Sequence, residues 1–309
     1  MASTDVTAGV ELRLHARRRR YGEDVVKVLL GVCALISVAT TVGIVIALFV
    51  PAFEFFGEVS IVDFFTGTEW APLFEPARFG VLPLIAGTLL VTTIAAIVAM
   101  PLGLGAAIYL SEYAGERARG ILKPALEILA GIPTIVFGYF ALTFVTPLLR
   151  DLGIQVDIFN SLSAGLVMGV MLMPIVASLS EDAMGAVPRD LRDGAYALGS
   201  TKVQVATRIV VPAAVSGIVA SFVLAISRAI GETMIVLIAM GQQARLTFDP
   251  REAAEAMTAF IAATGAGDVP TGSIEYKTIF AVGATLFLLT LVMNVVAIRL
   301  VRRYREVYE

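Results

Sequence analysis

Six long stretches without a charged side chain constrain the fold of this sequence more than any other feature. Five of them have 21 to 33 residues and cover positions 28–50, 79–111, 128–149, 158–180 and 278–298. The sixth, 209–227, has 19 residues, and Arg228 and Glu232 follow it before a second uncharged run begins at Thr233. A helix needs about 20 apolar residues to cross the core of a bilayer. We predict six transmembrane helices at about 27–51, 80–110, 126–148, 159–181, 208–240 and 278–300.

The composition agrees with a membrane protein. Apolar side chains make up 58% of the 309 residues and charged side chains 16%, whereas a soluble domain has about 25% charged residues. The single cysteine, Cys33, excludes an intrachain disulfide. The single histidine, His15, lies in an Arg-rich tail, which excludes an internal histidine-based metal or acid–base site. We therefore predict an all-α polytopic membrane protein without a metal or cofactor.

The distribution of Lys and Arg predicts the orientation. With a cytoplasmic N-terminus, 17 of the 23 basic residues fall on the cytoplasmic side, five fall in outer loops, and Arg228 lies inside a span. This asymmetry follows the positive-inside rule. We predict a basic cytoplasmic tail at 1–24, a transmembrane domain at 25–303 and a cytoplasmic end at 304–309. The first span is longer than the apolar part of a signal peptide, so we expect a retained anchor. We expect the tail to contact anionic lipid rather than nucleic acid.

The inner loop between the fourth and fifth spans predicts a short amphipathic helix at about 188–199. Pro188 suits a first helical position, and Gly199 ends the helix. Leu191, Ala195 and Leu198 fall on one apolar stripe, and the charged residues mostly face away from it. Thr201 and Gln204 have the spacing of a capping box that starts the next helix. Such a helix rests on lipid, serves as a connector, or enters the groove of a cytoplasmic partner.

Arg228, Glu232 and Thr233 are the polar residues of the fifth span to which we assign a substrate pathway. Residues four apart share a helix face, and charges at membrane depth face a cavity or a partner. Arg228 suits the oxygens of an oxyanion, and Glu232 would neutralise it in the resting state. The alternative is an ion pair that only ties helices together.

The two long outer loops indicate a function less specifically. Residues 51–78 are acidic and rich in aromatic side chains, which is typical of an interfacial belt or of a docking surface for an extracytoplasmic partner. Residues 242–277 predict a short helix at 250–263 followed by a glycine-rich stretch. The length of this loop favours a role in gating or docking.

One motif in the inner loop resembles a known family. Asp193-Gly194-Ala195, three residues, Gly199, nine residues, Ile209, one residue and Val211-Pro212 resemble the EAA loop of permeases of bacterial ABC importers. Asp, Gly and Val replace the Glu, first Ala and Leu of that pattern. In that family the loop couples to the ATP-hydrolysing subunit. The resemblance implies that the coupling residues include Leu191, Asp193, Gly194, Ala195, Leu198, Gly199, Ile209 and Pro212.

Further stretches resemble the PstC-type permease subunit of bacterial phosphate ABC importers, in the binding-protein-dependent transport permease family. They are residues 127–138 in the third span, 227–234 in the fifth, and 64–72, 79–80 and 87–88 nearer the N-terminus. The resemblance implies a subunit that translocates inorganic phosphate across the cytoplasmic (inner) membrane. It also implies three partners: an A-type permease in a heterodimer, a homodimer of cytoplasmic ATPase subunits, and an extracytoplasmic phosphate-binding protein.

Other functions remain open from the residues alone. The sequence has no G-x-x-x-x-G-K-[ST] phosphate loop, so we expect no ATPase activity in this chain. One alternative is an ABC permease for sulfate, molybdate or a phosphonate. Another is an ion-coupled secondary transporter with Glu232 as proton carrier, and a third is a scaffold or sensor anchor that transports nothing.

Overall fold

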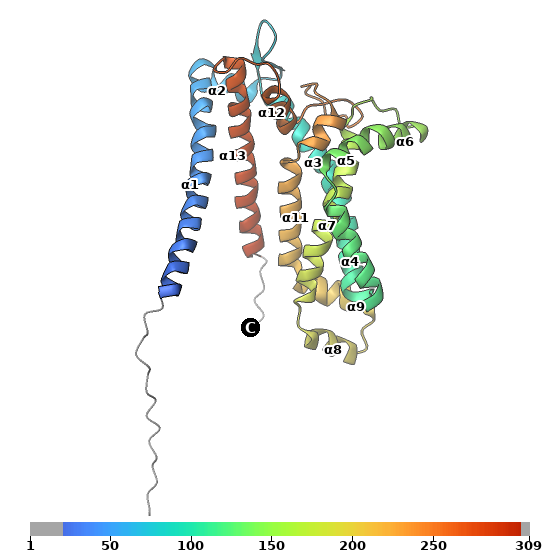
Figure 1. Cartoon of the computed structure of the whole chain (residues 1–309). Helices are drawn as coiled ribbons and strands as arrows, with labels where there is room; N and C mark the ends of the chain where they lie inside the picture. Colours follow the sequence, from blue (N-terminus) through green and yellow to red (C-terminus); the bar gives the residue numbers. More distant parts are fainter. Residues whose placement is uncertain (1–20, 304–309) are drawn as a thin grey trace, which may run out of the picture. The chain divides into compact units, whose positions relative to one another are not determined.

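The computed structural model describes residues 21–303 and is built almost entirely of helices (Figure 1). The α-helices are α1 (Tyr21–Glu58), α2 (Ile61–Thr66), α3 (Leu82–Ile108), α4 (Glu116–Ala130), α5 (Thr134–Phe140), α6 (Thr146–Asp151), α7 (Ser161–Gly185), α8 (Arg189–Ala197), α9 (Lys202–Val205), α10 (Val211–Ala213), α11 (Val215–Ile230), α12 (Met257–Gly265) and α13 (Ile274–Arg303). The π-helical segments are η1 (Tyr109–Tyr113), η2 (Ala141–Val145), η3 (Ala206–Val210) and η4 (Val236–Met240). Residues 1–20 of the tail predicted at 1–24, and the end predicted at 304–309, lie outside the described residues.

The chain divides into two compact units at Ala47. The described part of the first unit, residues 21–47, is the N-terminal part of α1. The second unit begins at Leu48 and holds the remainder of α1 and the other elements. Within the second unit, α8 lies at one end and α2 and α12 lie at the other (Figure 1). We call these the α8 end and the α12 end.

Four of the described helices are long and apolar enough to cross a membrane: Glu23–Glu58, Leu82–Tyr113, Ser161–Gly185 and Ile274–Arg299. Two pairs of helices extend the number of candidate spans to six if each bent pair is one span. Residues 116–151 bend by 88° between α4 and α5, and residues 202–230 bend by 71° between α10 and α11. The third and fifth predicted spans are therefore not single straight helices.

Both bends lie near proline. Pro133 precedes α5 with an extended backbone (φ −59°, ψ 136°), and a proline disfavours helical geometry in the residue before it. Pro212 lies in α10, two residues before the bend at Ala214 (φ −91°, ψ 3°). A proline has no N–H to donate to the preceding turn, so the helix is weakest there.

The centre of the second unit is the packed pair of α3 and α7. Small residues dominate their contact, as in membrane proteins, where close approach of backbones supplies the packing energy. The buried residues from the two helices include Val91, Ala95, Ala99, Ala164, Met168 and Leu172. α11 packs on this pair and α13 packs on α11.

The aromatic residues of the 51–78 loop form a second core at the α12 end. Phe55, Phe64 and Trp70 are buried together with Phe260 of α12. The backbone of Trp70 also pairs with that of Phe79, in a two-residue antiparallel ladder between β1 (Trp70–Ala71) and β2 (Arg78–Phe79). The prediction of an interfacial belt is wrong for these buried rings, and the all-α prediction missed the ladder.

The helix predicted at 250–263 begins later, as α12 at Met257. The carbonyl groups of the preceding residues accept hydrogen bonds from the start of α7. Leu162 N–H donates to Pro250 O at 2.7 Å, and Ser161 N–H donates to Glu252 O at 3.2 Å. These tertiary hydrogen bonds take the place of helical ones. The first seven residues of the predicted helix, 250–256, are therefore not helical, because tertiary packing overrides their local preference.

Candidate functional site

The helix α8 is bounded by local signals. Pro188 is its N-cap, and its last helical residue is Ala197. Gly199 has a positive φ of 81°, and its N–H donates to Tyr196 O at 2.9 Å. The predicted capping box is present, because Thr201 Oγ1 accepts from Gln204 N–H and the Gln204 side chain accepts from Thr201 N–H.

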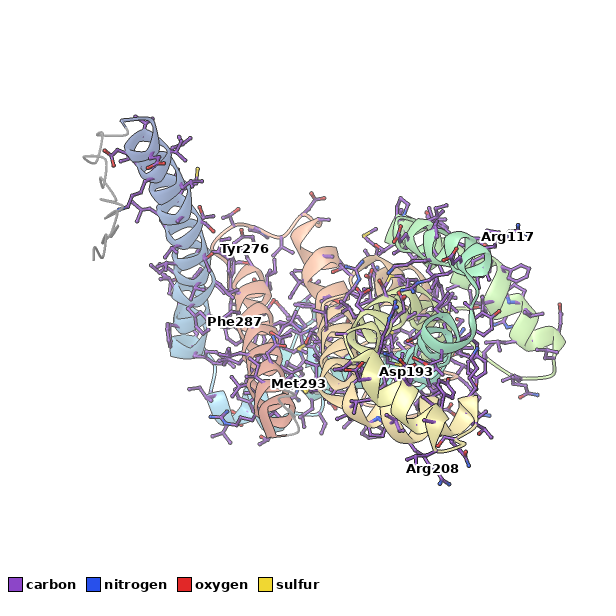
Figure 2. The ribbon with its side chains drawn as sticks, turned by 90° about the horizontal axis from the view of Figure 1, so that it is seen from below. Arg117, Asp193, Arg208, Tyr276, Phe287 and Met293 are labelled. Carbon is purple, nitrogen blue, oxygen red and sulfur yellow. The ribbon has the colours of Figure 1, made fainter. Side chains whose placement is uncertain are left out.

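The apolar stripe of α8 is split between the interior and the surface. Ala195 is buried against Val187 and Val205, whereas Leu191 is 38% exposed and Leu198 is 89% exposed. Leu198 lies one residue beyond the helix, so it does not continue the face that Ala195 buries. Asp193 and Gly194 are also exposed, and Figure 2 looks onto this end of the molecule with Asp193 labelled.

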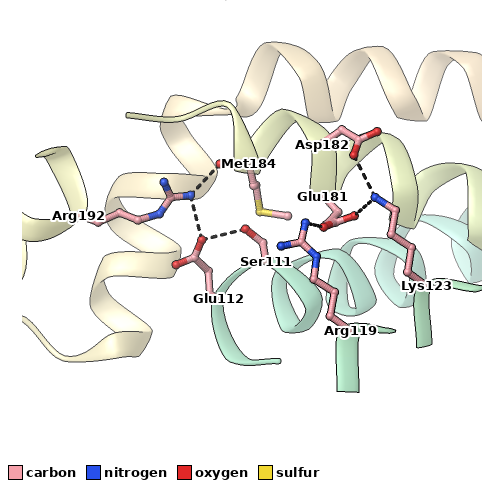
Figure 3. Close-up of polar contacts among 8 residues, drawn as sticks. All are labelled: Ser111, Glu112, Arg119, Lys123, Glu181, Asp182, Met184 and Arg192. Carbon is pink, nitrogen blue, oxygen red and sulfur yellow. Dashed lines mark hydrogen bonds and ion pairs between the residues drawn. The ribbon is translucent and has the colours of Figure 1, made fainter. Parts of the chain in front are cut away.

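The side chain of Arg192 faces the body of the protein, which the charge pattern of the helix does not predict. It donates to Val187 O at 2.6 Å and to Met184 O at 2.7 Å, at the C-terminal end of α7. It also donates to a carboxylate oxygen of Glu112 in η1 at 3.1 Å (Figure 3). Sequence reasoning missed this residue, because Glu112 lies 80 positions away and no local pattern indicates the pair.

A second polar cluster ties α4 to α7 beside this contact (Figure 3). The carboxylate of Glu181 is fully buried and accepts from Arg119 and from Lys123, the latter at 2.8 Å. Lys123 also contacts Asp182 at 3.3 Å. A buried carboxylate is tolerated when it is paired in this way. In the sequence, Arg119 and Lys123 count only among the basic residues that predict the membrane orientation.

The chain leaves α8 through α9, η3 and α10 and bends at Ala214 into α11. Ile209 is half-buried and packs against the cluster that contains Ala195 and Val205. Pro212 is exposed in α10. The motif residues from Asp193 to Pro212 thus form one connected region between α8 and the start of α11.

Arg228 and Glu232 do not share a helix face. α11 ends at Ile230 with Gly231 as its C-cap, and Glu232 lies in the break before the next helical turn. Arg228 is exposed in the last turn of α11, and Glu232 is buried. The two side chains form no ion pair within the described part of the chain. The prediction of a neutralising pair on one face is therefore wrong.

The carboxylate of Glu232 instead starts the helical stretch that leads into η4. One of its oxygens accepts from Met234 N–H at 3.1 Å and from Ile235 N–H at 3.4 Å. Anionic acceptors at a helix N-terminus satisfy N–H groups that lack an intrahelical partner. Thr233 is half-buried, and its hydroxyl donates to Gly231 O at 3.4 Å. Glu232 and Thr233 therefore stabilise the break itself.

The break is also held from outside. Thr258 of α12 donates its hydroxyl to Glu232 O at 2.6 Å. Gly138 of α5 faces the stretch after the break, where an added Cβ would lie 3.1 Å from Ile238 Cβ and from Met234 O. The structure thus brings residues 127–138 and 227–234, the two span motifs, into contact at this point.

Comparison with known proteins identifies the family. Residues 99–306 match the family described as "Binding-protein-dependent transport system inner membrane component". The chain belongs to this family. The matched region contains α8, the fifth candidate span and the last ten residues of α3. The family's description makes its members the membrane component of a transport system that depends on a binding protein.

Several relatives of this permease match most of its length. The probable ABC transporter permease protein YqgH of Bacillus subtilis is 34% identical over 295 residues, which cover 94% of each chain. The phosphate transport system permease protein PstC of Xylella fastidiosa is 34% identical over 256 residues, covering 76% of this chain and 77% of its own. PstC 1 of Mycobacterium tuberculosis is 35% identical over 280 residues, covering 78% and 82%.

Solved structures of ABC transporters share the fold of this permease. A chain of a bacterial alginate transporter, in complex with its periplasmic protein, superposes with a TM-score of 0.66 over 93% of this chain and 98% of its own, at 16% identity. A chain of the MetNI methionine transporter superposes with a TM-score of 0.56 over 74% and 95%, at 18% identity. These identities are low, so the likeness concerns the fold alone.

Among the described residues no group of three or more His, Cys, Asp and Glu is placed to hold a metal ion.

Proposed function

We propose that this chain is the PstC-type subunit of an ATP-driven importer that moves inorganic phosphate inward across the inner membrane. The observation that carries the proposal is the match to permeases named for phosphate transport over more than three quarters of the chain. The partners are an A-type permease, a pair of cytoplasmic ATPase subunits and an extracytoplasmic phosphate-binding protein. Both termini and α8 lie on the cytoplasmic side, and the α12 end lies outside.

In this proposal α8 is the coupling helix. Leu198 and Leu191 present apolar surface at the α8 end, and a groove of the ATPase receives them. Ala195 and Arg192 hold the opposite face of the helix against the protein. A displacement of α8 then passes through α9 and α10 to α11, because these elements follow one another without a long loop.

The substrate pathway runs past Arg228. Its guanidinium is exposed at the end of α11, offers paired donors to phosphate oxygens and cannot lose its proton. An exposed charge in a membrane span faces a cavity or a partner helix, which here is the interface with the A-type permease. Glu232 positions the break next to Arg228 through its backbone hydrogen bonds.

Transport by the complete complex in proteoliposomes tests this function. We expect uptake of radioactive phosphate that requires ATP, the ATPase subunits and the binding protein. Excess sulfate or molybdate should leave uptake unchanged. Uptake driven by a proton gradient without ATP would support a secondary transporter, and inhibition by another oxyanion would change the assigned substrate.

A further inference from the structure

A pocket of about 660 Å³ opens at the α12 end of the second unit. Its lining includes the loop that contains Trp70 and Phe74, and α12 with Phe260. Trp70 and Phe260 meet edge to face, with ring centroids 5.0 Å apart. The remaining lining comes from residues 242–244 and from the loop after α12. The pocket is therefore largely apolar, with rigid aromatic walls.

Two buried polar groups beside this pocket lack a partner. Glu255 is 6% exposed, and none of the described residues donates a hydrogen bond to its carboxylate or forms an ion pair with it. The indole N–H of Trp70 is buried and has no acceptor among the described residues, but it is closed off from the pocket. The carboxylate of Glu255 is therefore the group that a ligand can reach. A buried carboxylate without a partner indicates a ligand that supplies a donor or a cation.

The backbone around Glu255 is fixed in this position. Ala254 N–H donates to Met240 O at 3.3 Å, and Met257 N–H donates to Thr88 Oγ1 at 3.0 Å. Gly87 of α3 touches the carbonyl group of Glu255, where a larger residue would collide. The carboxylate is thus held in the pocket by residues of three separate segments.

The charge of the lining indicates the sign of the ligand. Glu255 and Asp268 line the pocket, and none of the other described residues that line it is Lys, Arg or His. Burial raises the pKa of Glu255 to about 7, so an incoming cation would favour the ionised carboxylate. Two carboxylates without a basic residue repel a phosphate anion, so this pocket is separate from the substrate pathway.

We propose that the pocket is a socket for a Lys or Arg side chain on a loop of the extracytoplasmic binding protein. The proposal rests on the proposed function, which places the α12 end outside. The aliphatic stem of the side chain packs against the apolar part of the lining, and its charged end pairs with Glu255. The two carboxylates of the lining, at the end that faces outside in the proposed function, complement a basic side chain of the protein that docks there.

Binding measurements on the complete transporter in nanodiscs test the socket. The probe is the purified cognate binding protein loaded with phosphate, and the variants are Glu255→Gln and Trp70→Phe. Loss of one partner of a buried charge pair costs about 2 kcal/mol or more, so we expect at least about 30-fold weaker binding for Glu255→Gln. Trp70→Phe keeps an aromatic side chain in the lining and removes an N–H that is closed off from the pocket, so we expect affinity close to that of the wild type. Asp249→Asn, whose carboxylate is already paired with Arg251 on the same segment, is the matched control and should bind normally.

A charge exchange identifies the occupant. Each Lys and Arg on the docking face of the binding protein is changed to Glu in turn. The affinity of each of these variants for the Glu255→Lys transporter is then measured. Recovery of affinity for one pair supports the socket. Unchanged affinity in Glu255→Gln overturns it, as does saturation of the pocket by spermidine with no effect on binding of the protein. ATP-driven uptake by the wild-type complex is measured on the same preparations, so that failure of the socket is distinguished from failure of the phosphate importer.

Discussion

The guanidinium of Arg192 in α8 donates to the carboxylate of Glu112 in η1 across 3.1 Å. η1 continues α3, and Arg192 also bonds the carbonyl groups of Met184 and Val187 where α7 ends. One side chain therefore connects α8 to both helices of the central pair. Force applied to α8 reaches α3 and α7 through this residue as well as through the chain into α11.

Replacing Arg192 with Ala should uncouple ATP hydrolysis from transport. Glu112 is 5% exposed and would lose its cation, and removing one partner of a buried pair costs about 3–5 kcal/mol. We expect a lower melting temperature and phosphate uptake reduced by roughly tenfold or more, with ATP hydrolysis retained. Arg189→Ala is the control, because Arg189 is exposed on the same helix. Normal uptake in Arg192→Ala would contradict the linking role.

Leu198 offers a test of the coupling surface that does not disturb the fold. Its side chain is 89% exposed, so Leu198→Ser should change stability by no more than about 0.5 kcal/mol. If the ATPase covers Leu198, the variant should recover less ATPase on purification and transport less phosphate. Leu152→Ser, at a residue that is also exposed but follows α6, should retain the ATPase. Equal recovery in both variants would exclude Leu198 from the contact.

The sequence predicts the features that depend on neighbouring residues. The start and end of α8 and the Thr201–Gln204 capping box follow from short motifs, and the structure contains them. The sequence does not predict where tertiary contacts override local preference. Gly231 interrupts a run that otherwise reads as helix, and the break is held by Thr258, which is 26 residues from Glu232. The inward orientation of Arg192 likewise depends on a partner that is distant in sequence.

Glu181 should matter for stability, unlike its neighbour Asp182. The Glu181 carboxylate is fully buried and holds Arg119 and Lys123 of α4 against α7, whereas the side chain of Asp182 is 62% exposed. Both cations are partly exposed, so water compensates them in part. We expect Glu181→Gln to lower the free energy of unfolding by about 1–3 kcal/mol and Asp182→Asn to lower it by less than about 1 kcal/mol. Thermal melting in detergent measures both, and equal losses would contradict this difference.

The buried carboxyl group of Glu255 should make the stability of the protein depend on pH. It lies outside the candidate spans, and burial raises its pKa from 4.5 to about 7. Between these values the unfolded chain has released the proton while the folded chain retains it, so raising the pH destabilises the fold. The loss approaches about 3 kcal/mol near pH 7 and then levels off. Glu255→Gln should abolish this part of the profile in melting experiments from pH 4.5 to 8, and an unchanged profile would contradict the raised pKa.

Arg228 and Glu232 should differ in their effects on transport, because the structure gives them different tasks. Arg228→Ala removes an exposed guanidinium at the end of α11, so we expect phosphate uptake to fall by about tenfold or more while the complex still assembles. Arg228→Lys keeps the charge without the paired donors and should recover part of the activity. Glu232→Gln retains an oxygen that accepts from Met234 and Ile235, so it should transport better than Glu232→Ala. Arg245→Ala, an exposed arginine outside the candidate spans, is the control. Full uptake in Arg228→Ala would remove this residue from the pathway and leave the break at Gly231 as a purely structural feature.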